Sequence, residues 1–245
     1  MELRLIMNGG GDVRVSNELR GWRLEGGDAY VRPSEISTPC PTKRDVWLLR
    51  SGVRLPSDGV VGKGVAYHNE ILSILGEVVL TGWDGLRRAV DSVRTHAGVW
   101  ALSIATAWLA NGGIPPMAIE PKLPPALGFT SSRPDLVVGN SPAEIAYVGD
   151  LRSRYVELKK VELAAYALIM EALTHIPINN AYLIEVSDRT VRVEVVGVDD
   201  TLRTEALSMR DSIAAMIKSK NPPPIPHECP QTCPLRRYCL GGGDG

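Results

Sequence analysis

The segment "RPDLVVGNSPAEIAYVGDLRS", residues 133–153, is the main basis for predicting the fold of this chain. Within it, "PDLVVG" and "AEIAYVGDLRS" have the composition of two strands, and the turn-forming residues "NSP" join them. Asp135 begins the first expected strand, and Asp150 ends the second. If the strands are neighbours, the two carboxylates meet at one end of a sheet.

Two adjacent carboxylates repel each other unless a cation lies between them. An all-oxygen pocket suits Mg²⁺ or Mn²⁺, which can bind a phosphate oxygen and activate a water. Arg152 follows Asp150 by two residues, so on a strand it would point to the same face and could hold a phosphate. The pattern Pro-Asp followed by Asp-x-cation resembles the sequence motif of the PD-(D/E)XK nucleases. The plainer interpretation is that both aspartates form turns or cap helices.

Two other acidic residues are alternatives to Asp150. Glu157-Leu158-Lys159 spells a literal E-x-K, but it lies where a helical pattern has begun. Glu144, at the start of the second expected strand, is the third candidate. Asp150 is the preferred second carboxylate.

Two helices contribute further candidates. "GKGVAYHNE", residues 62–70, places His68 on a helix, four residues after Gly64. The amphipathic helix expected over 155–175 places Glu162 and Tyr166 four residues apart, on one face. Each feature alone also fits an ordinary surface or core position.

The rest of the chain predicts an α/β domain with a small mixed sheet. A helix is expected from near Pro41, and one or two helices over 85–113. The proline-rich residues 114–134 predict a crossing without regular structure. A hairpin over 180–198, a helix over 199–220 with an aspartate cap, and a stiff linker over 221–226 complete the pattern.

Composition excludes some classes of protein. Hydrophobic residues make up 44% of the 245, charged residues 22%, and the formal net charge is −1, so any nucleic-acid surface must be a local basic patch. The N-terminus lacks a signal-peptide pattern, and the longest apolar run, residues 99–110, is too short to span a bilayer. We therefore expect a cytoplasmic protein that does not contact a membrane.

The cysteines predict a metal site. Three of the four lie in "HECPQTCPLRRYC", residues 227–239, and intracellular cysteines of this kind more often bind metal than form disulfides. Thiolates suit zinc or an iron–sulfur cluster, and the Cys-x3-Cys-x5-Cys spacing is wider than the common zinc Cys-x2-Cys. A single glutamine and proline-rich loops hint at a thermophile, whose cytosol tolerates disulfides. These residues leave all three interpretations open.

Together these features resemble the CRISPR-associated RecB-like iron–sulfur exonucleases, the archaeal branch of the Cas Four family, over residues 38–240. That family has one early and three late cysteines, a helical Gly-x3-His, an aspartate opening the sheet, an acidic-x-Lys on the next strand, and a Gln-x3-Tyr on the following helix. The matching residues here are Cys40, Cys229, Cys233, Cys239, Gly64, His68, Asp135, Asp150, Leu151, Arg152, Glu162 and Tyr166.

The resemblance implies a restriction-endonuclease-like PD-(D/E)XK mixed-sheet core with helical flanks, over residues 1–220, and an iron–sulfur tail over 221–245. It implies an exonuclease that acts on single-stranded DNA ends, processes prespacers in CRISPR adaptation, and works with the CRISPR integrase complex. The four cysteines would hold the cluster, most often four-iron, with a two-iron form as the alternative.

The resemblance also implies roles for individual residues. Mn²⁺ or Mg²⁺ would bind Asp135, Asp150, the Leu151 carbonyl and His68. The phosphate would be stabilised by Arg152 and positioned by Tyr166 and Glu162.

Two positions depart from the family pattern: Arg152 stands where lysine is usual, and Glu162 where glutamine is usual. Arginine keeps its proton and cannot act as a base. One alternative is therefore a catalytically weak or inactive subunit that binds DNA ends in the integration complex, and another is a zinc-stapled protein unrelated to CRISPR.

The candidate basic patch for a DNA strand lies at the two ends of this region. The tail "PLRRYC", residues 234–239, is expected to lie against a helix with Lys43, Arg44 and Arg50. A solvated basic face is the simpler interpretation of the same residues.

Overall fold

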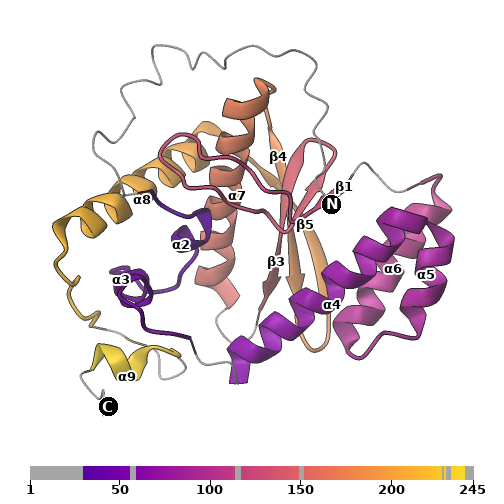
Figure 1. Ribbon diagram of the computed structural model, residues 1–245, viewed down its shortest axis with the longest axis horizontal. Coiled ribbons are helices and arrows are strands. Elements are labelled where there is room, and N and C mark those ends of the chain that lie inside the picture. The colour runs from indigo at the N-terminus through magenta and orange to yellow at the C-terminus, as the bar shows by residue number, and fades with distance from the viewer. Residues whose placement is uncertain are drawn as a thin grey trace.

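The computed structural model describes residues 30–55, 59–113, 117–148, 152–227, 229 and 233–240. Their helices and strands lie in the order shown in Figure 1. In chain order they are α2 (Pro33–Ile36), α3 (Arg44–Arg50), α4 (Gly59–Thr81), α5 (Trp83–Val90), α6 (His96–Ala110), β1 (Met117–Ile119), β2 (Leu136–Val138), β3 (Ser141–Tyr147), α7 (Arg152–Thr174), β4 (Asn180–Val186), β5 (Val191–Gly197), α8 (Asp200–Ser219) and α9 (Arg236–Cys239).

The strands form one mixed sheet in the order β1-β2-β3-β4-β5. The pairs β1–β2, β2–β3 and β4–β5 are antiparallel, and β3–β4 is parallel, with α7 as the crossover between them. Helices cover both faces of β3, and six of its seven residues are buried. The expected α/β domain with a small mixed sheet is therefore confirmed.

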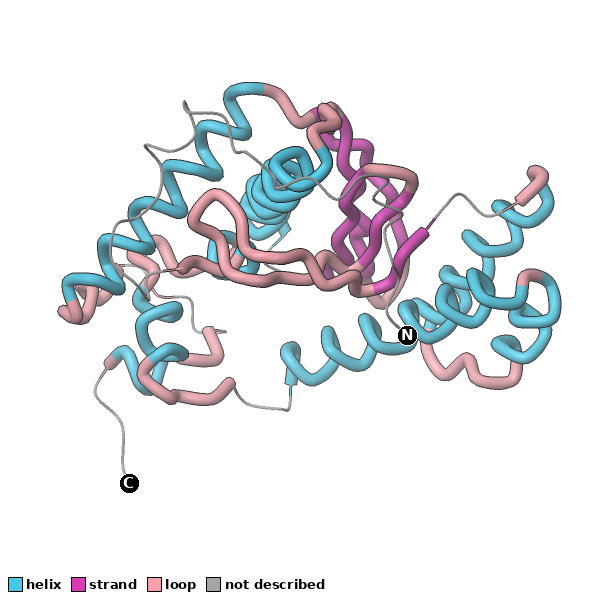
Figure 2. The backbone as a smooth tube through the Cα atoms, turned by 45° about the horizontal axis from the view of Figure 1, so that its top comes forward, coloured by secondary structure: helices cyan, strands magenta, loops and turns pink. Residues whose placement is uncertain are grey.

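Helices form a layer on each side of the sheet (Figures 1 and 2). On one side, α7 packs against β3 and β4, and α8 packs behind α7. The consecutive residues Leu163, Ala164 and Ala165 of α7 have no exposed surface, because the helix is packed on several sides. On the other side, α4 crosses the sheet and supports α5 and α6. The candidate site lies where α4 and α7 meet the β2–β3 hairpin.

Three expectations about individual elements were wrong: two boundaries and one strand that was not expected. The helix after Cys40 begins at Arg44, because Pro41 lies in a turn closed by a hydrogen bond from Lys43 N to the Cys40 carbonyl (3.1 Å). The proline-rich crossing contains strand β1, which pairs with β2. The second boundary concerns β3, which ends at Tyr147 instead of reaching Asp150.

Other expectations were confirmed. The hairpin over 180–198 is β4–β5, and the helix that follows is capped by Asp199, whose side chain accepts a hydrogen bond from Leu202 N (2.8 Å). Two helices, α5 and α6, occupy the segment for which one or two were expected. No helix among the described residues is long and apolar enough to cross a bilayer.

Candidate functional site

The β2–β3 hairpin brings Asp135 next to Glu144. Its register pairs Leu136 with Ala143 and Val138 with Ser141, so the next pair outward is Asp135 with Glu144. Directly opposed residues of an antiparallel pair point to the same face. The Asp135 amide donates to Glu144 Oε1 (3.2 Å), and Ile145 N donates to Asp135 Oδ2 (2.7 Å). These contacts fix both carboxylates at one end of the hairpin.

Helix α4 brings His68 to the same carboxylate. His68 Nε2 lies 2.8 Å from Asp135 Oδ1, and this hydrogen bond raises the pKa of His68. The helix is held over the sheet one turn earlier, where Gly64 faces Tyr147 of β3. Asp188, at the tip of the β4–β5 hairpin, accepts hydrogen bonds from the hydroxyls of Tyr67 (2.8 Å) and Tyr147 (3.0 Å). The position of His68 therefore depends on contacts with two hairpins.

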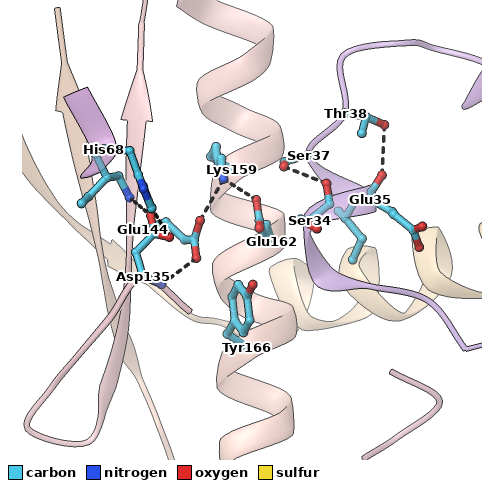
Figure 3. A network of polar contacts seen from close by, with 12 residues as sticks. Ser34, Glu35, Ser37, Thr38, His68, Asp135, Glu144, Lys159, Glu162 and Tyr166 are labelled. Atoms are coloured by element: carbon cyan, nitrogen blue, oxygen red, sulfur yellow. Dashed lines mark hydrogen bonds and ion pairs between the residues drawn. The ribbon is translucent and has the colours of Figure 1, made fainter. Parts of the chain in front are cut away.

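Helix α7 contributes a buried ammonium group. Lys159 Nζ lies 2.8 Å from Glu144 Oε2 and 2.7 Å from Glu162 Oε2 (Figure 3). Burial alone would lower the pKa of Lys159, but the charges of Glu144 and Glu162 hold it well above its usual value. Lys159 is therefore protonated, and it is the cation at the centre of the acidic group.

The two glutamates share this one ammonium. Glu144 is 3% exposed and Glu162 is 1% exposed. Burial raises the pKa of Glu144 well above its usual value, and the charge of Lys159 opposes that rise. An additional positive charge at this position would favour the ionised form of Glu144.

These groups line a pocket of about 430 Å³. Figure 3 shows His68, Glu144 and Asp135 on one side and Lys159 and Glu162 on the other, with Tyr166 one turn further along α7. The Tyr166 hydroxyl donates to the Arg133 carbonyl (3.0 Å), and burial raises its pKa. The exposed residues Arg32 and Arg133 also line the pocket, so its acidic floor has cationic side chains at the rim.

The structure brings most of the expected site residues together. His68, Asp135, Glu162 and Tyr166 line one pocket, as predicted. Asp150 and Leu151 lie outside the described residues, and their proposed roles stay predictions.

The expected position of Arg152 was wrong. It was predicted to continue the strand on the same face as Asp150, but it is the first residue of α7. The strand has already ended at Tyr147, so the period-2 argument does not reach this residue.

The literal E-x-K at 157–159 is not a strand motif. Glu157 and Lys159 lie in α7, where residues two apart point to different sides. Glu157 is exposed and pairs with Lys160 (3.1 Å), whereas Lys159 points into the pocket. The lysine of that alternative thus reaches the site from a helix, without its glutamate.

The sequence indicated only weakly that Glu144 and Lys159 belong to the candidate site. Glu144 was only the third candidate for the second carboxylate, and Lys159 was considered as the lysine of the alternative E-x-K at 157–159. Counting outward from the turn at Gly139 and Asn140 would have placed Glu144 opposite Asp135. No sequence signal gives the contact between Lys159 and Glu144, because it depends on how α7 packs on β3.

Among the described residues, no three His, Cys, Asp or Glu side chains are close enough to form a ready-made metal-binding group. His68 and Glu144 each contact Asp135 rather than facing a common point. One imidazole nitrogen and two carboxylates nevertheless make up a donor set that suits Mn²⁺ or Mg²⁺.

The cysteines lie where α9 packs against α3. Leu48 of α3, Leu235 and Cys239 form a small apolar cluster of their own. Burial raises the pKa of Cys239, and the neighbouring charges of Cys233 and Cys40 add to this. Burial and the charge of Cys229 raise the pKa of Cys233. Each cysteine therefore has at least one other cysteine as an electrostatic neighbour, although Cys40 is far from the rest in sequence.

The expected basic patch is wrong for the α3 residues. Lys43 Nζ donates to the carbonyls of Ile36 (2.7 Å) and Thr38 (2.8 Å), and burial lowers its pKa to about 8. Arg44 donates to the Pro223 carbonyl. Arg50, by contrast, binds Glu35, with 2.7 Å between Nε and Oε1. These cations hold the N-terminal segments and the linker together.

Comparisons with known proteins identify the family of this chain. The family model "CRISPR-associated exonuclease Csa1" matches residues 102–242, which include the hairpin, α7 and the late cysteines. A relative from Saccharolobus solfataricus with the same name is 25% identical over 275 residues, covering 92% of each chain. Because the family match covers more than half of the 245 residues, this chain belongs to the Csa1 family of CRISPR-associated exonucleases.

Proposed function

We propose that this protein is a metal-dependent exonuclease with a PD-(D/E)XK core, which degrades single-stranded DNA ends and processes prespacers for CRISPR integration. One observation carries the proposal: Asp135, Glu144, Lys159 and His68 converge in one pocket. The family name supports nuclease chemistry in a CRISPR context. The single-stranded substrate, the metal and the integrase complex are parts of the proposal that rest on the sequence resemblance.

The acidic side of the pocket would hold the metal. Its ligands would be the Asp135 and Glu144 carboxylates with His68 beside them, and Asp150 with the Leu151 carbonyl is the alternative second ligand pair. A bound Mn²⁺ or Mg²⁺ supplies a Lewis acid for a phosphate oxygen and lowers the pKa of a bound water. A hydrogen bond from Ile145 N holds the Asp135 carboxylate in place, and one from Asp135 N holds the Glu144 side chain.

Lys159 takes the place of the motif's lysine. Two residues after Glu144 the strand has Ala146, whereas an E-x-K motif has lysine there. We infer that the ammonium of Lys159 fills this position from α7 and stabilises charge on the scissile phosphate. Glu162 keeps the ammonium in place, and Tyr166 fixes the segment that precedes Asp135. Arg32 and Arg133, at the rim, would contact the phosphates of the entering strand.

The cysteine donor set fits an iron–sulfur cluster. Cys40, Cys229, Cys233 and Cys239 supply four thiols, the number that both common cluster types require. Apolar side chains around Leu48 and Leu235 pack against Cys233 and Cys239. A cluster here would link the segment before α3 to the tail, and by crosslink entropy such a long closed loop stabilises by about 4–5 kcal/mol.

The first prediction tests the activity. With Mn²⁺ or Mg²⁺, the protein is expected to shorten linear single-stranded DNA from its ends, and to leave circular single strands intact. Without divalent metal, cleavage should fall to background. The measurement follows 5′- and 3′-labelled oligonucleotides on denaturing gels, with a circular strand and EDTA as controls.

Tight binding of DNA ends without metal-dependent cleavage would contradict the exonuclease proposal. It would support the alternative, a DNA-end-binding subunit of the integration complex. Cleavage of the circular strand would contradict the requirement for an end.

The second prediction concerns the cluster. Protein purified without oxygen is expected to be brown, with near-equal iron and acid-labile sulfide per chain. Cys40→Ser should lose most of the iron, because it removes the ligand from the distant segment. Iron, sulfide and zinc assays with the visible spectrum measure this, and the exposed Ser73→Ala serves as the control.

A colourless protein with one zinc per chain would contradict the iron–sulfur proposal and support the zinc alternative. Unchanged iron in Cys40→Ser would show that a different residue completes the ligand set.

A further inference from the structure

β5 is an outer strand of the described sheet. Ser187 N donates to the Thr190 carbonyl and Val198 N to the Asn179 carbonyl, both at 2.9 Å, so these two pairs are the hydrogen-bonded kind. Because such pairs alternate along an antiparallel ladder, the N–H and C=O groups of Arg192, Glu194 and Val196 point toward β4. Those of Val191, Val193, Val195 and Gly197 therefore point away from the sheet.

The side chains of this strand separate into two classes. Arg192 and Glu194 lie on the α7 side, where Glu194 pairs with Lys160 (2.9 Å). Val191, Val193 and Val195 lie on the α6 side, and Val193 is 49% exposed and Val195 is 61% exposed. Long edges with exposed apolar side chains pair readily with another chain, and charged residues restrict which chain fits.

One register makes β5 complementary to itself. In this register a two-fold axis passes through Val193 and relates β5 to an antiparallel β5 of a second copy. Val193 then faces Val193 of the second copy and Val191 faces Val195, and both pairs use outward-pointing backbone groups. Arg192 then lies opposite Glu194 of the second copy, twice, in the closely spaced kind of pair.

Neighbouring registers lack this match. If one strand slides by two residues in one direction, Glu194 lies opposite Glu194 of the other copy. If it slides by two residues in the other direction, Arg192 lies opposite Arg192 of the other copy. Like charges directly opposite each other destabilise a ladder. The pattern Arg-Val-Glu thus selects one isologous, closed arrangement.

The α6 side of this edge is apolar as well. A cavity of about 380 Å³ lies between α6 and the sheet, lined by Ile104, Trp108 and Val193 among others. A second copy would extend this face and reduce the exposure of the valines. The apolar valines on the α6 side and the opposite charges of Arg192 and Glu194 on the α7 side therefore favour the same partner, β5 of a second copy.

We propose that β5 pairs with β5 of a second copy of this chain, about an axis at Val193, to give a continuous ten-stranded sheet. The arrangement is a property of the edge strand and is independent of the nuclease chemistry. Both candidate sites remain on the described elements away from this edge, so each copy keeps its own.

Reciprocal charge variants test the pairing. Arg192→Glu and Glu194→Arg each create two like-charge contacts in a homodimer, so each is expected to dimerise about tenfold more weakly or worse than the wild type. Mixed in equal amounts, they form two opposite-charge contacts, and a heterodimer of wild-type affinity is expected. Sedimentation velocity over a concentration series, with one variant fluorescently labelled, measures this.

Cysteine crosslinking tests the axis. In the proposed register, Val193→Cys places two Cα atoms about 5.5 Å apart, within disulfide range. The matched control Val195→Cys places them roughly 14 Å apart, which is out of range. Mild oxidation should therefore give a covalent dimer in the first variant, above the level that the native cysteines give in the wild type, and not in the second.

A wild-type protein that is monomeric at every concentration would overturn the proposal, and would mean that another segment or protein covers the edge. Failure of the mixed variants to associate, or equal crosslinking at 193 and 195, would overturn the register.

Discussion

Asp135→Asn is expected to abolish nuclease activity, with more than about a hundredfold loss in rate, because changes even to groups behind a metal ligand cost ten- to a hundredfold. The asparagine can still accept the hydrogen bond from Ile145 N, so the hairpin should keep its register. It loses the negative charge that faces His68 and the proposed metal. The rate on end-labelled single-stranded DNA in saturating Mn²⁺, together with iron content and melting temperature, measures the effect.

The matched control is Asp84→Asn on α5, an exposed residue whose ion pair with Arg87 lies far from the pocket. It should leave the rate unchanged. Glu144→Gln should behave like Asp135→Asn, because the hairpin register places Glu144 opposite Asp135. Full activity in Glu144→Gln together with loss in Asp150→Asn would favour the alternative second carboxylate. Full activity in Asp135→Asn would remove the site assignment altogether.

Lys159→Met is expected to lower both stability and activity. Removing one partner of a buried ion pair costs about 3–5 kcal/mol, because the opposite charges remain buried without compensation. Here two carboxylates, Glu144 and Glu162, lose the same ammonium. If Lys159 also stabilises charge on the phosphate, the rate should fall by about a hundred- to a thousandfold at temperatures where the variant is folded. Chemical denaturation and the cleavage assay measure the two effects.

The stability loss should depend on pH. Burial raises the pKa of Glu144 above its usual value of 4.5 in the folded protein, and removal of Lys159 takes away the charge that opposes this rise. A carboxyl with a raised folded-state pKa stabilises the fold when it is protonated, and that stabilisation is lost as pH rises through the raised pKa. The deficit of Lys159→Met should therefore be small near pH 4 and grow toward neutral pH.

Lys160→Met is the matched control. Lys160 is the next residue on α7, and it pairs with Glu157 and Glu194 near the surface. Its loss should cost at most about 1 kcal/mol and leave cleavage unchanged, because partly exposed ion pairs contribute little. Equal destabilisation by the two methionine variants, or a deficit at position 159 that does not change with pH, would contradict the buried triad.

The fold class followed from local patterns. The strand pair around 136–147, the β4–β5 hairpin and the amphipathic helix between them predicted an α/β domain with a small mixed sheet, and the described strands form one mixed sheet. Hydrophobic periodicity is a local property, so these elements could be predicted without any knowledge of their packing. The boundaries were less certain: neither the end of β3 at Tyr147 nor the start of α3 at Arg44 is marked by a strong sequence signal.

Residue types and their order were enough to predict His68, Asp135, Glu162 and Tyr166 as candidate site residues, and to indicate the family resemblance. Three contacts could be found only from the packed fold: Glu144 faces Asp135, Lys159 lies between Glu144 and Glu162, and Lys43 binds backbone carbonyls. Each of these contacts joins elements whose relative placement is set by packing of the whole core. Lys159, for example, reaches Glu144 on β3 only because α7 packs against that strand.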